Sequence, residues 1–232
     1  MTKELLIFGS SGALGNGVTE LFLKKNYDAF YLFDFKHKER DHTNIKFITI
    51  SDLSEEANVR KAFEQITPSK NKSFFLFSTI GGFTGGKNIW ETEIGNFDRM
   101  INLNLKTNFL LAKYFSLLVK KSHSGSICFT AAFTGIEAEA GKAIYGLSKS
   151  ALIHLVNTLA EEGNKINLSS NAIAPYIIDT PANREWMTNA DYESWIKPGE
   201  IGELVNFIFQ NYQFVSGNIF QLKHRLSGNK FD

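Results

Sequence analysis

The sequence predicts an α/β fold, a single Rossmann-type domain over residues 1–232 with a doubly wound parallel sheet of about seven strands and helices on both faces. Short β-branched and aromatic runs alternate with longer segments whose apolar residues recur at helical spacing. The short runs are almost continuously apolar, which is typical of strands that helices cover on both faces. A glycine-rich turn also joins the first run to the first helical segment.

The expected strands, in chain order, are residues 4–8, 29–34, 46–50, 74–79, 126–131, 170–174 and 218–222. Leu14, Val18 and Phe22 illustrate the helical spacing of the segments between them. We expect the polar segment 35–44 to be a solvated loop. Segment 179–198 is the longest without a strand, and in this architecture such a connection covers the ligand crevice at the carboxyl edge of the sheet.

Charge, hydropathy and cysteine content exclude several kinds of partner and site: nucleic acid, a membrane, an internal disulfide and a metal. Lys and Arg number 25 against 24 Asp and Glu, so no strong field attracts nucleic acid or an anionic membrane. No apolar stretch reaches the roughly 18 residues of a membrane span, and the apolar run at residues 5–8 is too short for a signal peptide. The single cysteine, Cys128, excludes an internal disulfide, and the five histidines lack metal-ligand spacing. We expect a cytoplasmic protein without a metal.

The turn after the first strand reads GSSGALG over residues 9–15. Gly9 permits a tight turn, Gly12 lets the backbone approach a pyrophosphate, and Gly15 allows close helix packing. Amides at the start of the following helix would receive the negative charge. Glycine turns also occur for steric reasons alone, but the strand before residues 9–15 and the helix after them favour a dinucleotide site. The expected contacts are Gly9, Ser11, Gly12, Ala13, Leu14 and Gly15.

Asp34 ends the second expected strand, about 20 residues after the last glycine of the turn. A carboxylate there accepts both hydroxyls of an adenosine ribose and repels a 2′-phosphate. With no arginine in the turn, we expect NAD as the cofactor, NADH being preferred to NADPH, although Lys36 and Lys38 lie close by. Asp52, with Leu53, either meets the adenine edge or caps the helix that follows.

Tyr145 and Lys149 lie four residues apart, so they share one face of a helix. A tyrosine pKa near 10 is too high for acid–base work at neutral pH, and an ammonium group one turn away lowers it. On its own, a tyrosine and a lysine at this spacing also occur by chance on a helix surface. Together with the glycine turn, the spacing favours a catalytic pair.

These motifs resemble those of the short-chain dehydrogenase/reductase family over essentially the whole chain. The matching positions are the turn 9–15, Asp34, Asp52, Asn104, Tyr145, Lys149 and the segment 171–175. The resemblance implies that Tyr145 donates a proton, that Lys149 holds the nicotinamide ribose and lowers the tyrosine pKa, and that Asn104 keeps a water in the proton relay. It also implies cofactor contacts at Ile80, Gly81, Gly82, Pro175, Ile177, Ile178 and Thr180.

The family's catalytic serine, 13 residues before the tyrosine, is replaced by Ala132. A ketone would lose one hydrogen bond to its developing negative charge, a deficit of about 3 kcal/mol. Thr134 is the nearest candidate to replace it. A narrower group, the dihydropteridine reductases, also resembles this chain in having alanine there, in the double-glycine loop 81–86 and in segment 179–195.

The narrower resemblance implies NADH-dependent hydride transfer to a quinonoid dihydropterin-like small molecule, with Tyr145 as proton donor. A carbonyl or alcohol oxidoreductase of the same family, such as an oxoacyl or keto reductase, is the alternative, and a catalytically silent dinucleotide-binding regulator is a third. A homodimer is expected because the helix carrying Tyr145 has a broader apolar surface than one sheet-facing stripe needs. That surface includes Ala151, Leu152, Ile153, Leu155, Val156, Leu159 and Ala160.

Overall fold

The computed structural model describes residues 1–40 and 42–226, and these form one sheet of seven parallel strands in the order β3-β2-β1-β4-β5-β6-β7. The strands are β1 (Thr2–Phe8), β2 (Ala29–Asp34), β3 (Ile45–Thr49), β4 (Lys72–Ser78), β5 (Ser124–Thr130), β6 (Leu168–Pro175) and β7 (Ile219–Leu222). The predicted fold class is confirmed, and each expected strand lies within two residues of its position in the sheet.

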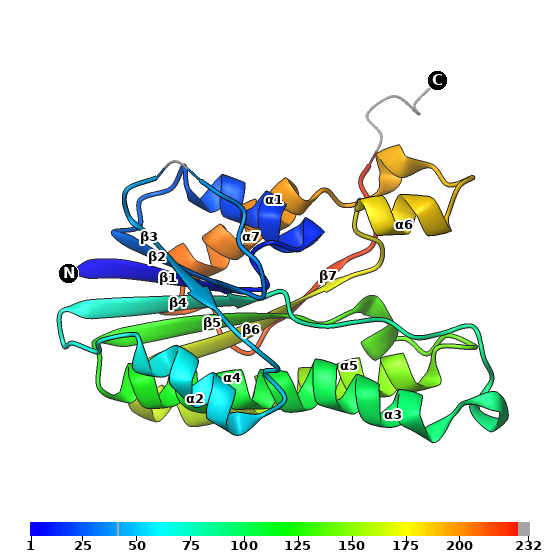
Figure 1. Ribbon diagram of the computed structural model, residues 1–232, viewed down its shortest axis with the longest axis horizontal. Helices are drawn as coiled ribbons and strands as arrows, with labels where there is room; N and C mark the ends of the chain where they lie inside the picture. Colours follow the sequence, from blue (N-terminus) through cyan, green and yellow to red (C-terminus); the bar gives the residue numbers. More distant parts are fainter. Residues whose placement is uncertain (41, 227–232) are drawn as a thin grey trace.

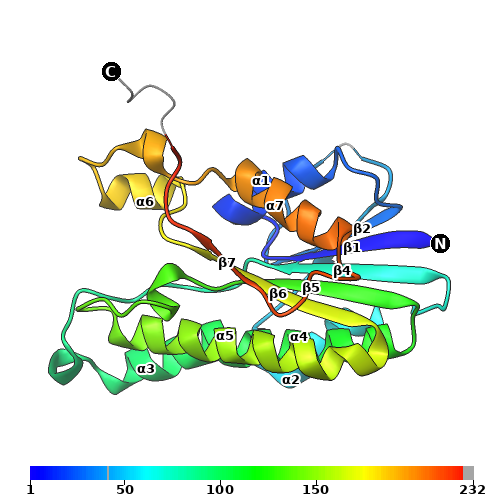
Figure 2. The ribbon, with the colours of Figure 1, turned by 180° about the vertical axis from the view of Figure 1, so that it is seen from behind.

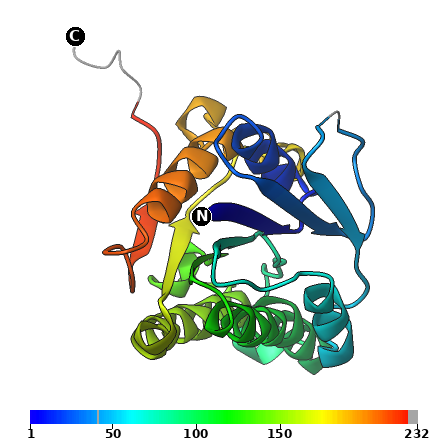
Figure 3. The same ribbon diagram turned by 90° about the vertical axis from the view of Figure 1, so that its left-hand side faces the viewer.

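Helices cover both faces of the sheet (Figure 1). Helices α1 (Ala13–Phe22) and α7 (Pro198–Gln210) lie on one face, and α2 (Glu56–Glu64), α4 (Thr107–Lys120) and α5 (Ala143–Gly163) lie on the other. Figure 3, viewed along the strands, shows the two helical layers with the sheet between them. This is why the strands read as continuous apolar runs, since both of their faces are buried.

Strand β1 shows how the sheet separates two cores. Leu5 and Ile7 pack with the core beneath α1 and α7, whereas Leu6 and Phe8 pack with the core beneath α2, α4 and α5. All four side chains are fully buried. The Phe8 ring also stacks on Phe33 of β2, with 4.0 Å between ring centroids. Alternate residues of one strand therefore join the two layers to the same sheet.

Short helical elements occupy the connections. Helix α3 (Ile94–Met100) continues through a π-helical turn, Ile101–Lys106, directly into α4. The carboxyl-side connections contain α6 (Pro181–Trp186) and the 3₁₀ turns Ile89–Glu91, Phe133–Gly135 and Tyr192–Ser194, whereas the 3₁₀ turn Asn164–Ile166 leads from α5 into β6 at the opposite edge. Because π-helical turns are rare and occur frequently at functional sites, the Ile101–Lys106 turn favours a functional role for this end of α4.

The carboxyl ends of all seven strands lie at one edge of the sheet, and the connection between β6 and α7 crosses that edge (Figures 1 and 2). A bridge between Ile178 and Ile196 joins the two ends of this connection, and α6 lies between them. The strand order reverses between β1 and β4, where ligands bind in sheets of this type. Segment 179–198 therefore covers the edge, as expected.

The segment 35–44 is only partly the solvated loop that its composition predicts. The Arg40 side chain is 5% exposed, because its guanidinium group pairs with Glu20 and donates to Asn16 Oδ1 at 3.0 Å, both on α1. Residue 41 of this segment lies outside the described residues. Long-range ion pairing, which local polarity does not reveal, explains the difference.

No helix in residues 1–40 and 42–226 has the length and apolar content to cross a membrane.

Candidate active site

Two adjoining cavities lie at the carboxyl edge of the sheet. The turn cavity, about 500 Å³, is lined by Gly9, Gly12, Asp34, Asp52 and Leu53 among others. The tyrosine cavity, about 540 Å³, contains Tyr145, Lys149, Ala132 and Trp186 among its lining residues. Thr79 and Gly81 line both, so the two form one continuous crevice across the switch point. A crevice of this length suits an extended dinucleotide with a substrate at one end.

The glycine turn fits the phosphates of such a molecule. Gly9 has a φ of +82°, and a Cβ on Gly15 would lie 1.9 Å from the Gly9 carbonyl oxygen, so both positions need glycine for the turn itself. A Cβ on Gly12 would meet only the Gly9 oxygen at 3.7 Å and otherwise open space. Helix α1 begins one residue later, at Ala13. The turn therefore presents bare backbone and a helix N-terminus to the cavity.

Asp34 stands at the end of β2 with its carboxylate held in place. Oδ2 accepts a hydrogen bond from the Ser11 backbone amide at 2.7 Å, and Oδ1 accepts one from the Phe35 amide at 2.8 Å. The Ser11 hydroxyl donates to the Lys36 carbonyl oxygen at 2.6 Å, which ties the glycine turn to the loop after β2. Ser11 thus positions Asp34 and does not itself line the cavity.

Asp52 lines the turn cavity together with Gly9 and Gly12. Its Oδ1 accepts from the Ser54 amide at 2.8 Å, and hydrogen bonds from Ser54 lower the pKa of its carboxyl group. Helix α2 begins at Glu56 and its N-cap is Glu55. The interpretation of Asp52 as a helix N-cap is therefore wrong, because the chain makes an additional turn before the helix begins.

Tyr145 and Lys149 project into the tyrosine cavity from the first turns of α5. The Lys149 ammonium group is buried, donates to the Thr130 carbonyl oxygen at 2.7 Å, and lies 5.9 Å from the centroid of the Tyr145 ring. Burial and, to a smaller extent, the Glu139 carboxylate raise the pKa of Tyr145 to about 12. Burial also lowers the pKa of Lys149 to about 8.

The expected lowering of the tyrosine pKa is therefore not found. Removing the phenol from water disfavours its charged form, and the nearby Glu139 charge acts in the same direction. Lys149 does not offset these two effects on the Tyr145 pKa. The spacing of the two residues correctly predicts their shared helix face but not the electrostatic balance around them.

Asn104 is buried within the π-helical turn. Its side-chain oxygen accepts from the Gly82 amide at 2.8 Å, and its Nδ2 donates to the Gly82 carbonyl at 3.0 Å and to Ser148 Oγ at 2.9 Å. Ser148 in turn donates to the Tyr145 carbonyl oxygen at 2.8 Å. Asn104 thereby connects the loop after β4 to the helix that carries Tyr145. Its part in a proton relay stays a prediction.

Ala132 is buried and lines the tyrosine cavity, where the missing serine would stand. The threonine hydroxyls that line this cavity all donate elsewhere. Thr79 donates to the backbone oxygens of Phe8 and Gly9, and Thr130 donates to the Ser78 carbonyl at 2.8 Å. Thr134 donates to a Glu139 carboxylate oxygen.

Glu139 is ionised in this arrangement. Burial raises its pKa, but hydrogen bonds from Lys142 and Thr134 outweigh that effect and hold the pKa below its usual value. A carboxylate only accepts hydrogen bonds, so the Thr134 hydroxyl must be the donor. Thr134 in this state does not supply the hydroxyl proton that the serine would.

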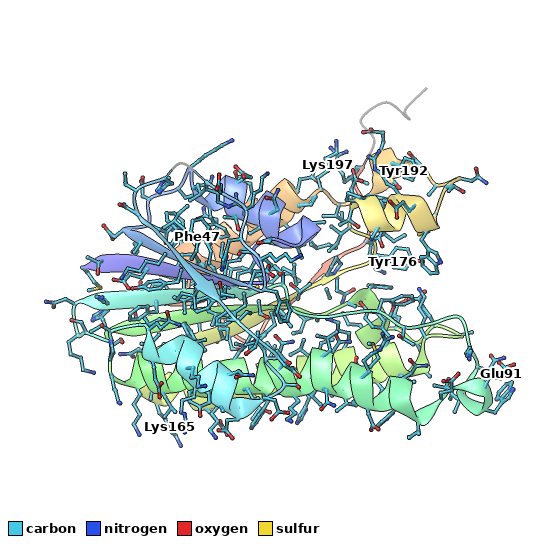
Figure 4. All side chains as sticks on the ribbon, in the orientation of Figure 1. Phe47, Glu91, Lys165, Tyr176, Tyr192 and Lys197 are labelled. Carbon is cyan, nitrogen blue, oxygen red and sulfur yellow. The ribbon has the colours of Figure 1, made fainter. Side chains whose placement is uncertain are left out.

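One wall of the tyrosine cavity is aromatic. The Phe83 ring lies edge-on to Tyr145, with centroids 5.0 Å apart, and 5.5 Å from the ring of Trp186 on α6. Tyr176 follows β6 and is half exposed, and its side chain lies beneath α6 (Figure 4). Trp195 is buried, and Trp90 is 83% exposed in the Ile89–Glu91 turn. Among the three tryptophans, Trp186 is the one that lines this cavity.

Most of the predicted site residues come together in the crevice. Those lining it are Gly9, Gly12, Leu14, Asp34, Asp52, Leu53, Ile80, Gly81, Gly82, Tyr145, Lys149, Pro175, Ile177 and Ile178. The other predicted residues lie outside the lining: Ser11 positions Asp34, Ala13 starts α1, Gly15 packs on the turn, Asn104 holds Gly82, and Thr180 caps α6.

Several polar residues of the site were not predicted from the sequence, among them Thr79, Lys142 and Glu139. Thr79 follows β4 directly and lines both cavities, which its place at the end of a central strand could have suggested. Lys142 precedes Tyr145 by three residues and so shares its helix face, a signal that was present. Glu139 belongs to no motif, and nothing in its local sequence marks it.

The chain is similar to several known proteins. A family model described as enoyl-(acyl carrier protein) reductase matches residues 34–222. A dihydropteridine reductase of Dictyostelium discoideum is 28% identical over 205 residues, which are 88% of this chain and 86% of that protein. A 7alpha-hydroxysteroid dehydrogenase of Bacteroides fragilis is 26% identical over 196 residues, 78% of this chain and 73% of that protein. The structure titled "ElxO with NADP Bound" has a TM-score of 0.80 at 20% identity, covering 96% of this chain and 98% of that one.

Proposed function

Because the chain belongs to the short-chain dehydrogenase/reductase family, it is an oxidoreductase of the nicotinamide-dinucleotide-dependent class, and we propose that its substrate is a quinonoid dihydropterin-like ring. The reaction is the transfer of a hydride to the ring and of a proton from Tyr145. The similarity to a dihydropteridine reductase supports this choice, while the similarity to a hydroxysteroid dehydrogenase keeps carbonyl reduction as the competing outcome of the test.

One observation carries the proposal. Ala132 replaces the serine, and the threonine hydroxyls lining the tyrosine cavity, including that of Thr134, have already donated their protons to other groups. A ketone builds negative charge on one oxygen in the transition state, and a lost donor to that oxygen costs about 3 kcal/mol. An electron-poor conjugated ring spreads the incoming charge, so it depends less on such a donor.

Tyr145 holds the proton that the proposed reaction requires. With its pKa raised to about 12 by burial and by the Glu139 charge, it is protonated throughout the neutral range. That state is the one required for reduction, in which the residue acts as an acid. When bound, the reduced dinucleotide supplies the hydride. Lys149 would hold the nicotinamide ribose, and Gly81, whose Cβ position lies 2.9 Å from the Lys149 ammonium, leaves room for that approach.

The turn cavity supports NADH in preference to NADPH. The Asp34 carboxylate lines it and is fixed by two backbone amides, so that it stands ready for the ribose hydroxyls. Arg40 could offset a 2′-phosphate charge, but its guanidinium group is committed to Glu20 and Asn16 on α1. The structural neighbour ElxO binds NADP, so the choice at Asp34 is a property proposed for this chain alone.

The substrate would lie against the aromatic wall. Phe83 from the loop after β4 and Trp186 from α6 both line the tyrosine cavity, and their ring centroids lie 5.5 Å apart. Trp186 is 68% exposed, which leaves most of its surface available to another ring. Aromatic rings stack on flat heterocycles with a gain of about 0.5–1.5 kcal/mol beyond simple burial.

The test is NADH oxidation by the purified protein with a quinonoid dihydropterin beside a ketone panel that includes a steroid ketone and a 3-oxoacyl thioester. We expect kcat/KM for the pterin to exceed that of every ketone at least 100-fold. A ketone that is reduced faster would contradict the proposal and favour a carbonyl reductase. No turnover with any substrate, together with tight dinucleotide binding, would favour a regulator.

We also propose that two chains pair through α4 and α5. Leu152, Val156 and Leu159 of α5 pack into the chain's own core, but Phe109, Leu117 and Leu147 on the outer surfaces of these helices are about half exposed. A shallow apolar groove containing Leu105, Leu147 and Leu155 adjoins them. A two-fold axis through this surface would cover the apolar residues of both copies.

A further inference from the structure

The tyrosine cavity has a polar corner formed by Thr134, Glu139 and Lys142. The Glu139 carboxylate accepts from the Thr134 hydroxyl through one oxygen and from the Lys142 ammonium group, at 2.7 Å, through the other. Thr134 and Lys142 both line the tyrosine cavity, whereas Glu139 lies behind them and lines a neighbouring cavity of about 430 Å³. Glu139 therefore sets the hydrogen-bonding state of two groups that substrate can reach.

The directions of the hydrogen bonds to Glu139 decide which donors and acceptors Thr134 and Lys142 present to a ligand. A threonine hydroxyl has one proton, and once it is given to Glu139 the oxygen can only accept from the cavity. The Lys142 ammonium group has three protons and no acceptor. Within the described residues its hydrogen bond to Glu139 is the one recorded, so further donors remain for a ligand. The corner thus presents an acceptor beside a donor.

Lys142 stands where a positive charge is unfavourable. It is the N-cap of α5, a helix of 21 residues, and a cation at a helix N-terminus opposes the helix dipole. Its side chain is only 28% exposed, and Glu139, 25% exposed, neutralises it from behind. The ion pair holds the ammonium group at the cavity and limits its cost there.

We propose that this corner recognises a lactam edge, a ring N–H adjacent to a ring C=O, on the substrate. Thr134 accepts from the N–H and Lys142 donates to the C=O. Because both groups bind the two oxygens of a single carboxylate, they stand side by side, as the partners of two adjacent ring atoms must. The inference rests on the proposed function, since a pterin carries this edge and a simple ketone lacks it.

A ring whose edge has the opposite donor and acceptor pattern tests the proposed lactam recognition directly. 6-Methylpterin has the N–H and C=O pair, whereas 2,4-diamino-6-methylpteridine has a ring nitrogen acceptor beside an amino donor. Binding of each is measured by pterin fluorescence in the protein loaded with NAD⁺, so no turnover is involved. We expect the wild type to bind 6-methylpterin at least tenfold more tightly, in line with one hydrogen bond to a charged group and one to a neutral group.

Three variants test the assignment. Lys142→Met and Glu139→Gln should each reduce the preference to within about threefold, and Lys142→Arg should retain most of it. Glu137→Gln is the matched control: it makes the same substitution two residues away, at a carboxylate that pairs with Lys223 at 3.7 Å and not with Thr134. It should leave the preference unchanged, and thermal unfolding checks that all variants fold.

The outcomes separate this inference from the proposed function. Equal binding of the two probes by the wild type, or a preference that survives both Lys142→Met and Glu139→Gln, would overturn the lactam assignment even if the enzyme reduces the pterin. A preference that the two variants remove would support the assignment even if quinonoid dihydropterin is not turned over. In that case the substrate is another lactam-bearing ring.

Discussion

Restoring the missing hydroxyl by Ala132→Ser tests the proposed chemistry at its central point. Ala132 is buried in extended backbone, with φ −157° and ψ 154°, and lines the tyrosine cavity with Tyr145. Serine adds one oxygen to that methyl group, and its neighbour Thr134 already occupies the Glu139 carboxylate, so the new proton is free to face the substrate. The variant therefore acquires the donor that a developing alkoxide requires.

The expected change in kcat/KM follows from the contribution of one hydrogen-bond donor to the transition state. A hydrogen bond to a developing oxyanion contributes about 3 kcal/mol, or roughly 100-fold in rate. We expect kcat/KM for ketones to rise by up to about 100-fold, while kcat/KM for the quinonoid dihydropterin stays the same or falls. The assay is NADH oxidation with both substrates, compared within one preparation.

Ala131→Ser is the matched control: Ala131 borders the same cavity, but its side chain packs in the core beneath α4 and α5, on the opposite face of the extended segment from that of Ala132, so its hydroxyl would not assist a ketone. A gain in ketone reduction with Ala131→Ser would point to a general loosening of the site. A rise of pterin reduction by Ala132→Ser in parallel with the ketones would refute the reasoning, since it would mean that the natural substrate also builds charge on a single oxygen.

Four further predictions concern the same crevice and the outer helices. Tyr145→Phe should lower kcat at least 100-fold and change the NADH dissociation constant less than twofold, as stopped-flow and fluorescence titration would show. Asp34→Ala should weaken NADH binding about tenfold and NADPH binding much less; equal loss would contradict the ribose assignment. The pKa of Lys149 is about 8 in the folded protein and 10.5 in the unfolded chain, so between these pH values the unfolded chain binds a proton that the folded protein does not. The free energy of unfolding should therefore rise with pH across this window, by about 3 kcal/mol more in the wild type than in Lys149→Met. Leu147→Glu should shift sedimentation from dimer to monomer; a wild-type protein that sediments as a monomer at micromolar concentration would refute the pairing.

Much of the crevice follows from local sequence. The expected strands, the glycine turn, Asp34 at the end of β2 and the Tyr145–Lys149 spacing depend on residues within a few positions of one another. Parallel strands bring their carboxyl ends to one edge, so these local features must meet there. This is why a single sequence was enough to place 14 of the predicted residues in the lining of two adjoining cavities.

Hydrogen-bond direction and burial depend instead on the tertiary structure. Local sequence marks Thr134 as a candidate to replace the serine, but only the folded chain reveals that Glu139 takes its proton. The Tyr145 pKa is likewise raised by burial, because desolvation of the phenol exceeds any effect of a lysine one helical turn away. Arg40 reads as part of a solvated loop until α1 supplies its partners. The sequence by itself determined which groups surround the crevice, and the tertiary structure decided their charge states and donors, because those depend on neighbours that are distant along the chain.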